Sequence, residues 1–348
     1  MNIIKRVFSK HSSEQGAALV VVMLFLLLVA LISGASVVLV RTVELSSRSV
    51  TGLNKFNLLA EGAANRVKWI IIHDKSKNHP RSLGSKEALD KSEELKLDRF
   101  LADGNIYTVN YYGYVLDVQV NDAVSGVSLD GADPSEQLDF MRVFFERDKS
   151  AGSSADRKER LEVFQRRLRD YVDNNKTAEI DGMEESDYIS EKIPALPRNA
   201  PVQYRQEILW ILGAEKLFHP DRNGLLSFFK IVTPDKLPLI KGRQNFFSVS
   251  EEYMKTVCKL EHDELEAVNE AVKNWYKEGK PLEESLDLAV YSKIKAQLSF
   301  SESGFYSLRI RPNFKSSRAI PGRTYCETVR LGKSPPQKQF YYYESSFY

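Results

Sequence analysis

The chain has 348 residues, of which 43% are hydrophobic and 28% are charged, and its formal net charge is +2. That length is enough for two modest domains. The nearly neutral balance argues against a nucleic-acid-binding protein and against attraction to an anionic membrane surface. Membrane anchoring, assembly and catalysis remain as function classes.

The first predicted element is an apolar helix over residues 16–40. No charged residue interrupts this run before Arg41, and at about 1.5 Å per residue the helix just spans the hydrocarbon core of a bilayer. A short basic leader, residues 1–15, precedes it. Because the positive end stays in the cytoplasm, we expect a single-pass anchor with everything after Arg41 outside.

Two interpretations of this N-terminus compete: an ordinary signal peptide or signal anchor, and a prepilin-type leader. A cleavable signal peptide has a shorter apolar region, of about 7–15 residues. Here Gly16 directly precedes the apolar run and follows the polar residues Ser12-Ser13-Glu14-Gln15. This arrangement resembles the leader of type IV prepilins and pseudopilins. The resemblance implies that a prepilin peptidase cuts between Gly16 and Ala17, on the cytoplasmic side, and that the mature chain keeps its apolar segment.

The sequence departs from the common pilin pattern at the fifth residue after this cut. Most members carry a glutamate there, whereas this chain has Val21. A carboxylate inside a membrane costs a few kcal/mol and is retained only for a partner, which in pilins is the N-terminal amine of a neighbouring subunit. The large minor pseudopilin of the K type in type II secretion also lacks this glutamate, so Val21 directs the resemblance toward that member.

The helix is predicted to continue beyond Arg41 to about Ile72. Apolar residues recur there at three- and four-residue spacing, with polar residues such as Glu61, Arg66 and Lys68 on the other face. The buried stripe consists of Leu53, Phe56, Ala60, Ala63, Ala64, Val67 and Ile71. Residues 60–64 also resemble the small-residue stretch of K-type pseudopilins, which lets a sheet approach the helix closely.

Strands are predicted on both sides of a long helical region. Residues 106–112 and 114–120 alternate in the manner of a half-buried sheet, with Leu116, Val118 and Val120 facing inward. Residues 298–310 look like the returning strand pair of a pilin sheet. Further edge strands are predicted over 325–331 and 339–343.

Helical periodicity dominates from Ser135 to about Ala296. One predicted stripe contains Leu138, Met141, Phe144 and Phe145, and another contains Leu161, Phe164, Leu168 and Tyr171. Residues 208–212 are uniformly apolar, which predicts a central core helix that Pro201 opens and Gly213 closes. The order of segments 120–130, 168–173, 199–201 and 207–213 resembles that of K-type pseudopilins. The sequence departs from the family pattern at two places, which are Asp130, where the family has an asparagine, and residues 247–250.

The sequence contains no recognisable catalytic motif. The five histidines show no zinc spacing, and no phosphate-binding loop or nucleophile elbow is present. We therefore predict that the protein is not an enzyme.

One acidic loop is a candidate calcium site. Its oxygen-bearing side chains fall at the first, third, fifth, ninth and twelfth places of a calcium-loop template, but the sixth place is Ala178 instead of the turn-making glycine. These residues are Asp173, Asn175, Thr177, Asp181 and Glu184, with Asp187 nearby. Calcium binding by K-type members in their helical domain is implied here by resemblance. A solvated acidic loop is the other interpretation.

The two cysteines, Cys258 and Cys326, are far apart in the sequence. In an exported protein they can form a disulfide, and the alternative is two buried free thiols. The residues alone do not decide between these alternatives.

Taken together, the ordered motifs resemble a K-type minor pseudopilin of a type II secretion system. This implies an α+β, pilin-like fold in which a long N-terminal helix packs on an antiparallel sheet that carries a large inserted all-α domain. It also implies other minor pseudopilins and a prepilin peptidase as partners, no nucleic acid, and residence in the inner membrane with the C-terminal bulk in the periplasm. The expected segments are 1–16 (leader), 17–40 (membrane and filament core), 41–121 (helix and first strands), 122–296 (helical insertion) and 297–348 (returning strands).

Two alternatives remain. A tip subunit of a type IV pilus is the nearer one, since it has the same leader and the same helix. A membrane-anchored periplasmic enzyme comes from another class, and it predicts no cleavage after Gly16.

Overall fold

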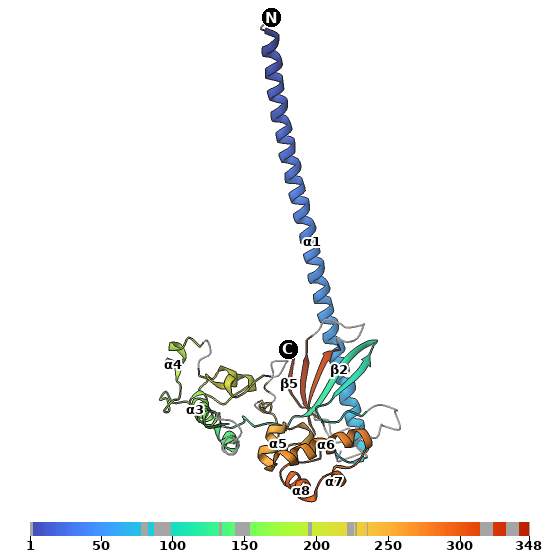
Figure 1. Cartoon of the computed structure of the whole chain (residues 1–348), viewed down its shortest axis with the longest axis vertical. Coiled ribbons are helices and arrows are strands. Elements are labelled where there is room, and N and C mark those ends of the chain that lie inside the picture. Colours follow the sequence, from blue (N-terminus) through green and yellow to red (C-terminus); the bar gives the residue numbers. More distant parts are fainter. Residues whose placement is uncertain are drawn as a thin grey trace. The chain divides into compact units, whose positions relative to one another are not determined.

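The structure is a computed structural model (Figure 1). It describes residues 3–77, 83–86, 99–131, 134–142, 154–193, 197–220, 226, 228–234, 236–313, 323–331 and 341–347. The chain divides into two compact units, Met1–Phe56 and Asn57–Tyr348. Helix α1, Ile3–Lys77, contributes to both of them.

Within the first unit, α1 exposes its apolar side chains on every side. Leu19, Phe25, Ile32 and Val40 are each more than half exposed. A helix that is apolar all round needs a lipid or protein environment. Among the described residues, one helix, in the range Leu19–Lys75, is long and apolar enough to cross a membrane by its length and composition. The prediction of an N-terminal apolar helix fit to be a single anchor is confirmed at this level.

Within the second unit, residues 57–77 of α1 bury the predicted stripe. Ala60, Ala64 and Ile71 are fully buried, and Ala63 and Val67 are nearly so. A Cβ added at Gly62 would lie 2.6 Å from the hydroxyl oxygen of Tyr111, so the Tyr111 side chain would have to shift. The prediction of Lys68 on the polar face is wrong, since this residue is only 7% exposed.

Five antiparallel strands form one sheet in the order β1-β2-β3-β4-β5. The strands are β1 (Ile106–Tyr111), β2 (Tyr114–Asp122), β3 (Phe305–Pro312), β4 (Tyr325–Arg330) and β5 (Tyr341–Phe347). Leu116, Val118 and Val120 are fully buried, as the alternation predicts. β4 is an interior strand between β3 and β5, so its prediction as an edge strand is wrong. Residues 339 and 340 of the last predicted strand lie outside the described residues.

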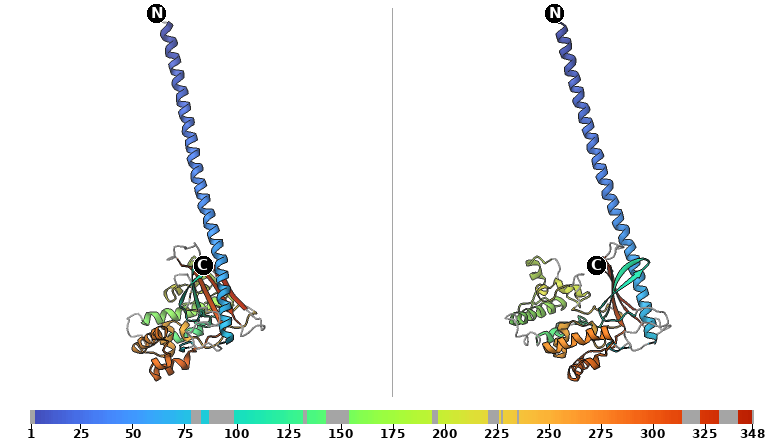
Figure 2. Two further views of the ribbon diagram at one scale, coloured as in Figure 1. Left: turned by 90° about the vertical axis from the view of Figure 1, so that its right-hand side faces the viewer. Right: turned by 45° about the vertical axis from the view of Figure 1, so that its right-hand side comes forward.

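The helices lie in the chain between β2 and β3, which are neighbours in the sheet. This confirms an α+β fold in which a long N-terminal helix packs on an antiparallel sheet with a helical insertion. Figure 2 shows the C-terminal part of α1 running beside the sheet. The helices are η2 (Pro134–Leu138), α3 (Ser154–Val172), α4 (Glu185–Ser190), η3 (Arg205–Trp210), η4 (Ala214–Lys216), η5 (Phe246–Ser248), α5 (Glu251–Cys258), α6 (His262–Glu278), α7 (Leu282–Ser285) and α8 (Leu288–Gln297).

The insertion has two main hydrophobic clusters. The first helical cluster gathers buried residues from Val127 to Val232, including the predicted stripe Leu161, Phe164, Leu168 and Tyr171. The second helical cluster joins residues 246–298 to Leu83 and Leu101, with Trp275 at its centre. Figure 1 shows α5 to α8 in one group and α3 and α4 in another. Leu138 and Met141 are buried in the first cluster, while Phe144 and Phe145 lie outside the described residues.

The helix predicted between Pro201 and Gly213 is shorter and of a different type. It is the 3-10 helix η3, which ends at Trp210 because Ile211 has extended backbone angles. With three residues per turn, Ile208 and Ile211 face the core together and Trp210 points away, half exposed. Gly213 does not close this helix; its φ of 93° turns the chain into η4.

Both cysteines are buried thiols outside any disulfide, Cys258 at the end of α5 and Cys326 in β4. The alternative of two buried thiols therefore describes this structure, and the disulfide is absent from it. Burial raises the pKa of the Cys258 thiol to about 11, so this thiol is neutral near pH 7.

Candidate functional site

The acidic loop between α3 and α4 folds through short-range hydrogen bonds. The carboxylate of Asp173 accepts a bond from the backbone N–H of Asn175 at 3.1 Å, and the Asn175 side chain accepts one from the N–H of Thr177 at 2.7 Å. Such Asx turns are typical of aspartate and asparagine in loops. They use Asp173 and Asn175 to shape the backbone.

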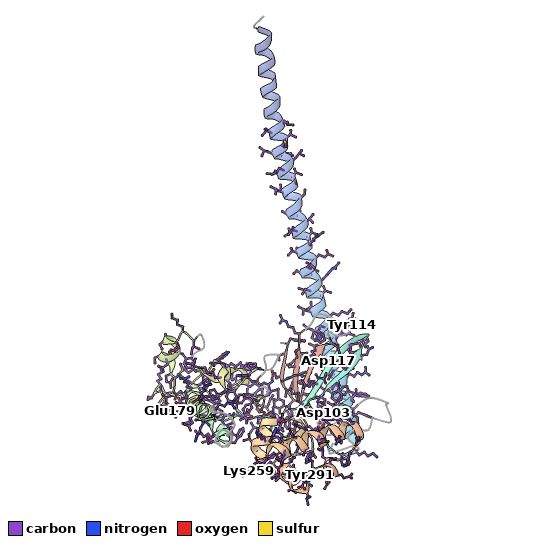
Figure 3. The ribbon with its side chains drawn as sticks, viewed as in Figure 1. Asp103, Tyr114, Asp117, Glu179, Lys259 and Tyr291 are labelled. Carbon is purple, nitrogen blue, oxygen red and sulfur yellow. The ribbon has the colours of Figure 1, made fainter. Side chains whose placement is uncertain are left out.

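Asp170, which the sequence analysis did not select, organises this loop. Its fully buried carboxylate accepts hydrogen bonds from the backbone N–H groups of Glu179, at 3.2 Å, and Met183, at 2.8 Å. Gly182 is required beside it, because a Cβ there would come within 1.8 Å of the Asp170 carboxylate. Glu179, labelled in Figure 3, pairs with Arg169 at 2.9 Å. Asp170 looks like one more polar position of α3 in the sequence, so no local signal distinguishes it.

The predicted calcium ligands do not converge as a set. The carboxylate of Asp181 is exposed and lies 3.4 Å from Arg166, whereas Asp187 accepts a hydrogen bond from the N–H of Glu184 at 2.8 Å. Among the described residues, no group of three or more His, Cys, Asp or Glu side chains is placed to hold a metal ion. The oxygen donors are of the type that calcium prefers, but the structure does not assemble them into a coordination shell.

Glu184 is the one predicted ligand with an unsatisfied atom. Only 5% of the residue is exposed, and its Oε1 is buried without a hydrogen-bond partner. Burial raises the pKa of this carboxyl group, and the negative charges of Asp170 and Asp173 raise it further. The pKa of Asp170 is raised for the same first reason. Mutual repulsion of carboxylates therefore adds to the effect of burial at Glu184.

A second polar centre joins the sheet to the helical insertion. Asp122, at the end of β2, accepts hydrogen bonds from the Ser303 hydroxyl at 2.6 Å, the Ser303 N–H at 2.8 Å and the Val124 N–H at 3.0 Å. Its own N–H donates to the Ser248 hydroxyl, which in turn donates to the carbonyl of Ala102 at 2.7 Å. Three distant segments therefore meet at one aspartate.

Asp103 makes an equivalent connection to the second helical cluster (Figure 3). Its carboxylate accepts hydrogen bonds from the hydroxyl of Tyr107 in β1 at 2.9 Å and of Tyr276 in α6 at 2.8 Å. Burial raises the pKa of Asp103 despite these donors. The pKa of Tyr276 is raised by burial and then by the Asp103 charge, so the phenol stays protonated and keeps donating.

A cavity of about 790 Å³ lies beside this joint and is lined by Asp103, Asp122 and Arg205 among others. The two carboxylates in its wall already accept bonds from hydroxyl and backbone donors. Through these hydrogen bonds the two carboxylates connect separate segments of the chain, which is a structural role.

A buried ion pair connects α1 to β4 of the sheet. The Lys68 ammonium lies 2.5 Å from Glu327 in β4, and both side chains are less than a tenth exposed. The other oxygen of Glu327 accepts a bond from the Tyr325 hydroxyl at 3.0 Å, and the ring of Tyr342 in β5 lies 4.9 Å from the ammonium. The pair thus couples α1 to β4 and β5.

Comparisons with known proteins bear on the fold. No family model matches the chain, and no curated protein matches it. A chain of the crystal structure of the GspK-GspI-GspJ complex from the enterotoxigenic Escherichia coli type 2 secretion system is similar to it, with a TM-score of 0.50. The two share 13% sequence identity, and the similarity covers 87% of this chain and 99% of that chain. The fold is pseudopilin-like.

In this pseudopilin-like fold, the residues predicted for leader cleavage lie inside α1. The side-chain surroundings of Gly16 and Ala17 are outside the described part of the chain. Val21 lies on the apolar segment and is 65% exposed. Gly16, Ala17 and Val21 belong to the first unit, whereas the acidic loop and Asp122 belong to the second.

Proposed function

We propose that this chain is a minor pseudopilin of the K type, which acts by assembly at the tip of a type II secretion pseudopilus. The observation that carries the proposal is the order of elements: an apolar helix that continues into a sheet, with a helical insertion between β2 and β3. A solved chain similar over most of this length occurs in a complex with two other proteins. By analogy, two smaller minor pseudopilins are the partners.

The proposed mechanism needs no catalytic residue. The apolar part of α1 holds the protein in the inner membrane, with the rest of the chain in the periplasm, and later packs against the helices of other subunits. Val21 suits a tip subunit, because no subunit stands above it whose terminal amine requires a carboxylate. The helical insertion covers the filament end and prevents further addition there.

Processing of the leader tests this proposal. Co-expression with a prepilin peptidase should shorten the protein by the leader, and mass spectrometry should find a mature N-terminus at Ala17. Gly16→Arg should block the cut, whereas Ser13→Arg, which adds the same charge earlier in the leader, should leave it intact. A mature N-terminus elsewhere, for instance near Ala35, would contradict the assignment.

We also propose that calcium binds at the acidic loop. The support is donor chemistry: buried carboxyl groups at Asp170 and Glu184, and an Oε1 of Glu184 without a partner. A divalent cation bound there would supply charge neutralisation and would order the loop between α3 and α4.

A further inference from the structure

Within the part of the chain that the structure describes, strand β1 is an edge of the sheet without the usual protection. Among the described residues it pairs with β2 alone, in a continuous register without a bulge. Its sequence, Ile-Tyr-Thr-Val-Asn-Tyr, contains no charge and no proline, and Ile106, Thr108 and Asn110 are exposed. Proteins blunt free edges with lysines, prolines or bulges, because unpaired backbone groups recruit another strand. β1 is therefore open to strand addition.

A groove of about 250 Å³ runs between this edge and α1. Its walls combine apolar side chains, with Ala63, Val67 and Ile70 from α1 facing Val109 and Tyr111 of β1, with the polar residues Arg66, Thr108 and Asn110. It has room for apolar side chains of an added strand. Alternate residues of a strand share one face, so every second side chain of such a strand would enter it.

Exposed apolar side chains continue this surface along α1. Leu58, Gly62 and Trp69 share one face of the helix, since they are spaced by four and seven residues. Gly62 lies under Tyr111, which places Leu58 and Trp69 on the β1 side. Both are more than half exposed, as is Tyr112 at the turn after β1. We name the groove together with these three exposed side chains the β1–α1 surface.

The charge in the groove indicates what kind of strand fits. Arg66 is the one charged residue among those lining it, and Arg66 is exposed with no ion pair to any described residue. A β1–β1 pairing of two copies would offer it no carboxylate from that strand. Pairing of β1 with the other edge, β5, would supply Glu344 but would repeat head to tail into an open polymer. An acidic strand from a different chain satisfies the surface without polymerisation.

We propose that the β1–α1 surface binds an extended strand of another pseudopilin subunit, apolar at alternate positions and carrying a carboxylate that pairs with Arg66. The strand adds to the free edge of β1 through main-chain hydrogen bonds, and its apolar side chains fill the groove. This inference rests on the proposed function, which supplies the partner class, and adds the surface and the chemistry of recognition.

The test uses the full chain, purified in detergent, mixed with the full-length minor pseudopilins of the same secretion system. Hydrogen exchange should show the amides of β1 slowing in the mixture. Arg66→Glu should weaken binding about tenfold, whereas Arg66→Lys should retain most of the affinity. Thr108→Lys should also weaken binding, because a lysine blunts the edge. The control is Lys273→Glu, which changes the net charge equally at an exposed position of α6.

The outcomes separate two kinds of failure. Suppose that the wild-type chain binds a pseudopilin, that hydrogen exchange of β1 is unchanged, and that Arg66→Glu and Thr108→Lys bind with wild-type affinity. The proposed role of the β1–α1 surface is then overturned and the proposed function stands. If the wild-type chain binds no pseudopilin, the proposed function fails and this inference fails with it. Protection of β1 in the chain alone, rising with its concentration, would identify a second copy as the occupant and overturn the inference.

Discussion

Asp122 places a carboxyl group where ionisation is unfavourable. Its burial raises the pKa from 3.8 to about 6, although Ser303 and Val124 donate hydrogen bonds to it, and the charge of Glu302 raises the pKa further. The joint between sheet and insertion therefore depends on the protonation of one residue.

We expect the stability of the joint to fall as the pH rises through about 6. A carboxyl group with a raised folded-state pKa contributes stability that is fully present below its unfolded pKa, near 3.8, and is lost above its folded pKa. The contribution lost between those limits is about 3 kcal/mol. Asp122→Asn removes this titration, so unfolding free energies from urea titrations at several pH values should change less across that range.

The matched control is Asp263→Asn, at an exposed position in the first turn of α6. It should leave the pH dependence of the wild-type protein unchanged. Equal pH dependence of Asp122→Asn and wild type would mean that Asp122 titrates as an ordinary exposed carboxyl group.

Calcium is expected to act on the acidic loop through Glu184. If the ion binds the folded state alone, it stabilises that state by about 2.7 kcal/mol at a hundredfold excess over the dissociation constant. Thermal melts of the fragment from Arg41 onward, with calcium and with chelator, measure this shift. Glu184→Gln should abolish it and Glu185→Gln, at an exposed neighbour, should not. Coincident melting curves for the wild-type fragment would leave a solvated loop.

At the scale of elements, the ion pair of Lys68 and Glu327 sets how α1 is attached to β4. Removing one member leaves a buried charge, so Lys68→Met should cost about 3 kcal/mol of unfolding free energy. The double variant Lys68→Met/Glu327→Gln should recover at least half of that loss, since no unpaired charge remains. Denaturant titrations of the single and double variants check the coupling, and Lys273→Met is the exposed control. Additive effects would show that the two charges act independently.

The long helix and the first strands could be predicted because their patterns are local. The stripe from Ala60 to Ile71 repeats every three or four residues, and the alternation around Val118 needs no knowledge of distant segments. The fold class follows from the position of helical segments between strands. These features of the sequence are periodic, so one sequence is enough to recognise them.

The positions that sequence analysis missed are set by distant contacts. Lys68 is polar and spaced like its exposed neighbours, but Glu327, 259 residues away, draws it into the core. The role of Asp170 is set by a turn that begins nine residues later, and the form of η3 by packing of Ile208 and Ile211 in the first helical cluster. The calcium-loop spacing predicted ligands from sequence order, whereas the burial of the Asp170 and Glu184 carboxyl groups is determined by how the chain folds.

At the scale of the whole molecule, the bulk of the insertion bears on copy number. The segment between β2 and β3 carries two hydrophobic clusters, and a tightly packed filament cannot repeat such bulk at every subunit. We expect the soluble fragment from Arg41 onward to bind the soluble domains of two smaller minor pseudopilins and to remain monomeric alone. Light scattering on the separate and mixed proteins decides this. A stable homopolymer, or the lack of any complex, would count against the tip role.

The insertion between two adjacent strands also constrains how the chain folds. Asp122 and Ser303, which hydrogen-bond at the mouth of the insertion, are 181 residues apart in the sequence. Closing an unfolded loop of that length costs roughly 4 to 5 kcal/mol of chain entropy before the β2–β3 ladder returns any energy. A folded insertion brings its own ends together and removes this cost. We therefore expect the helical clusters to act as a folding template for the sheet, so that early formation of α3 and α6 speeds the pairing of β2 with β3.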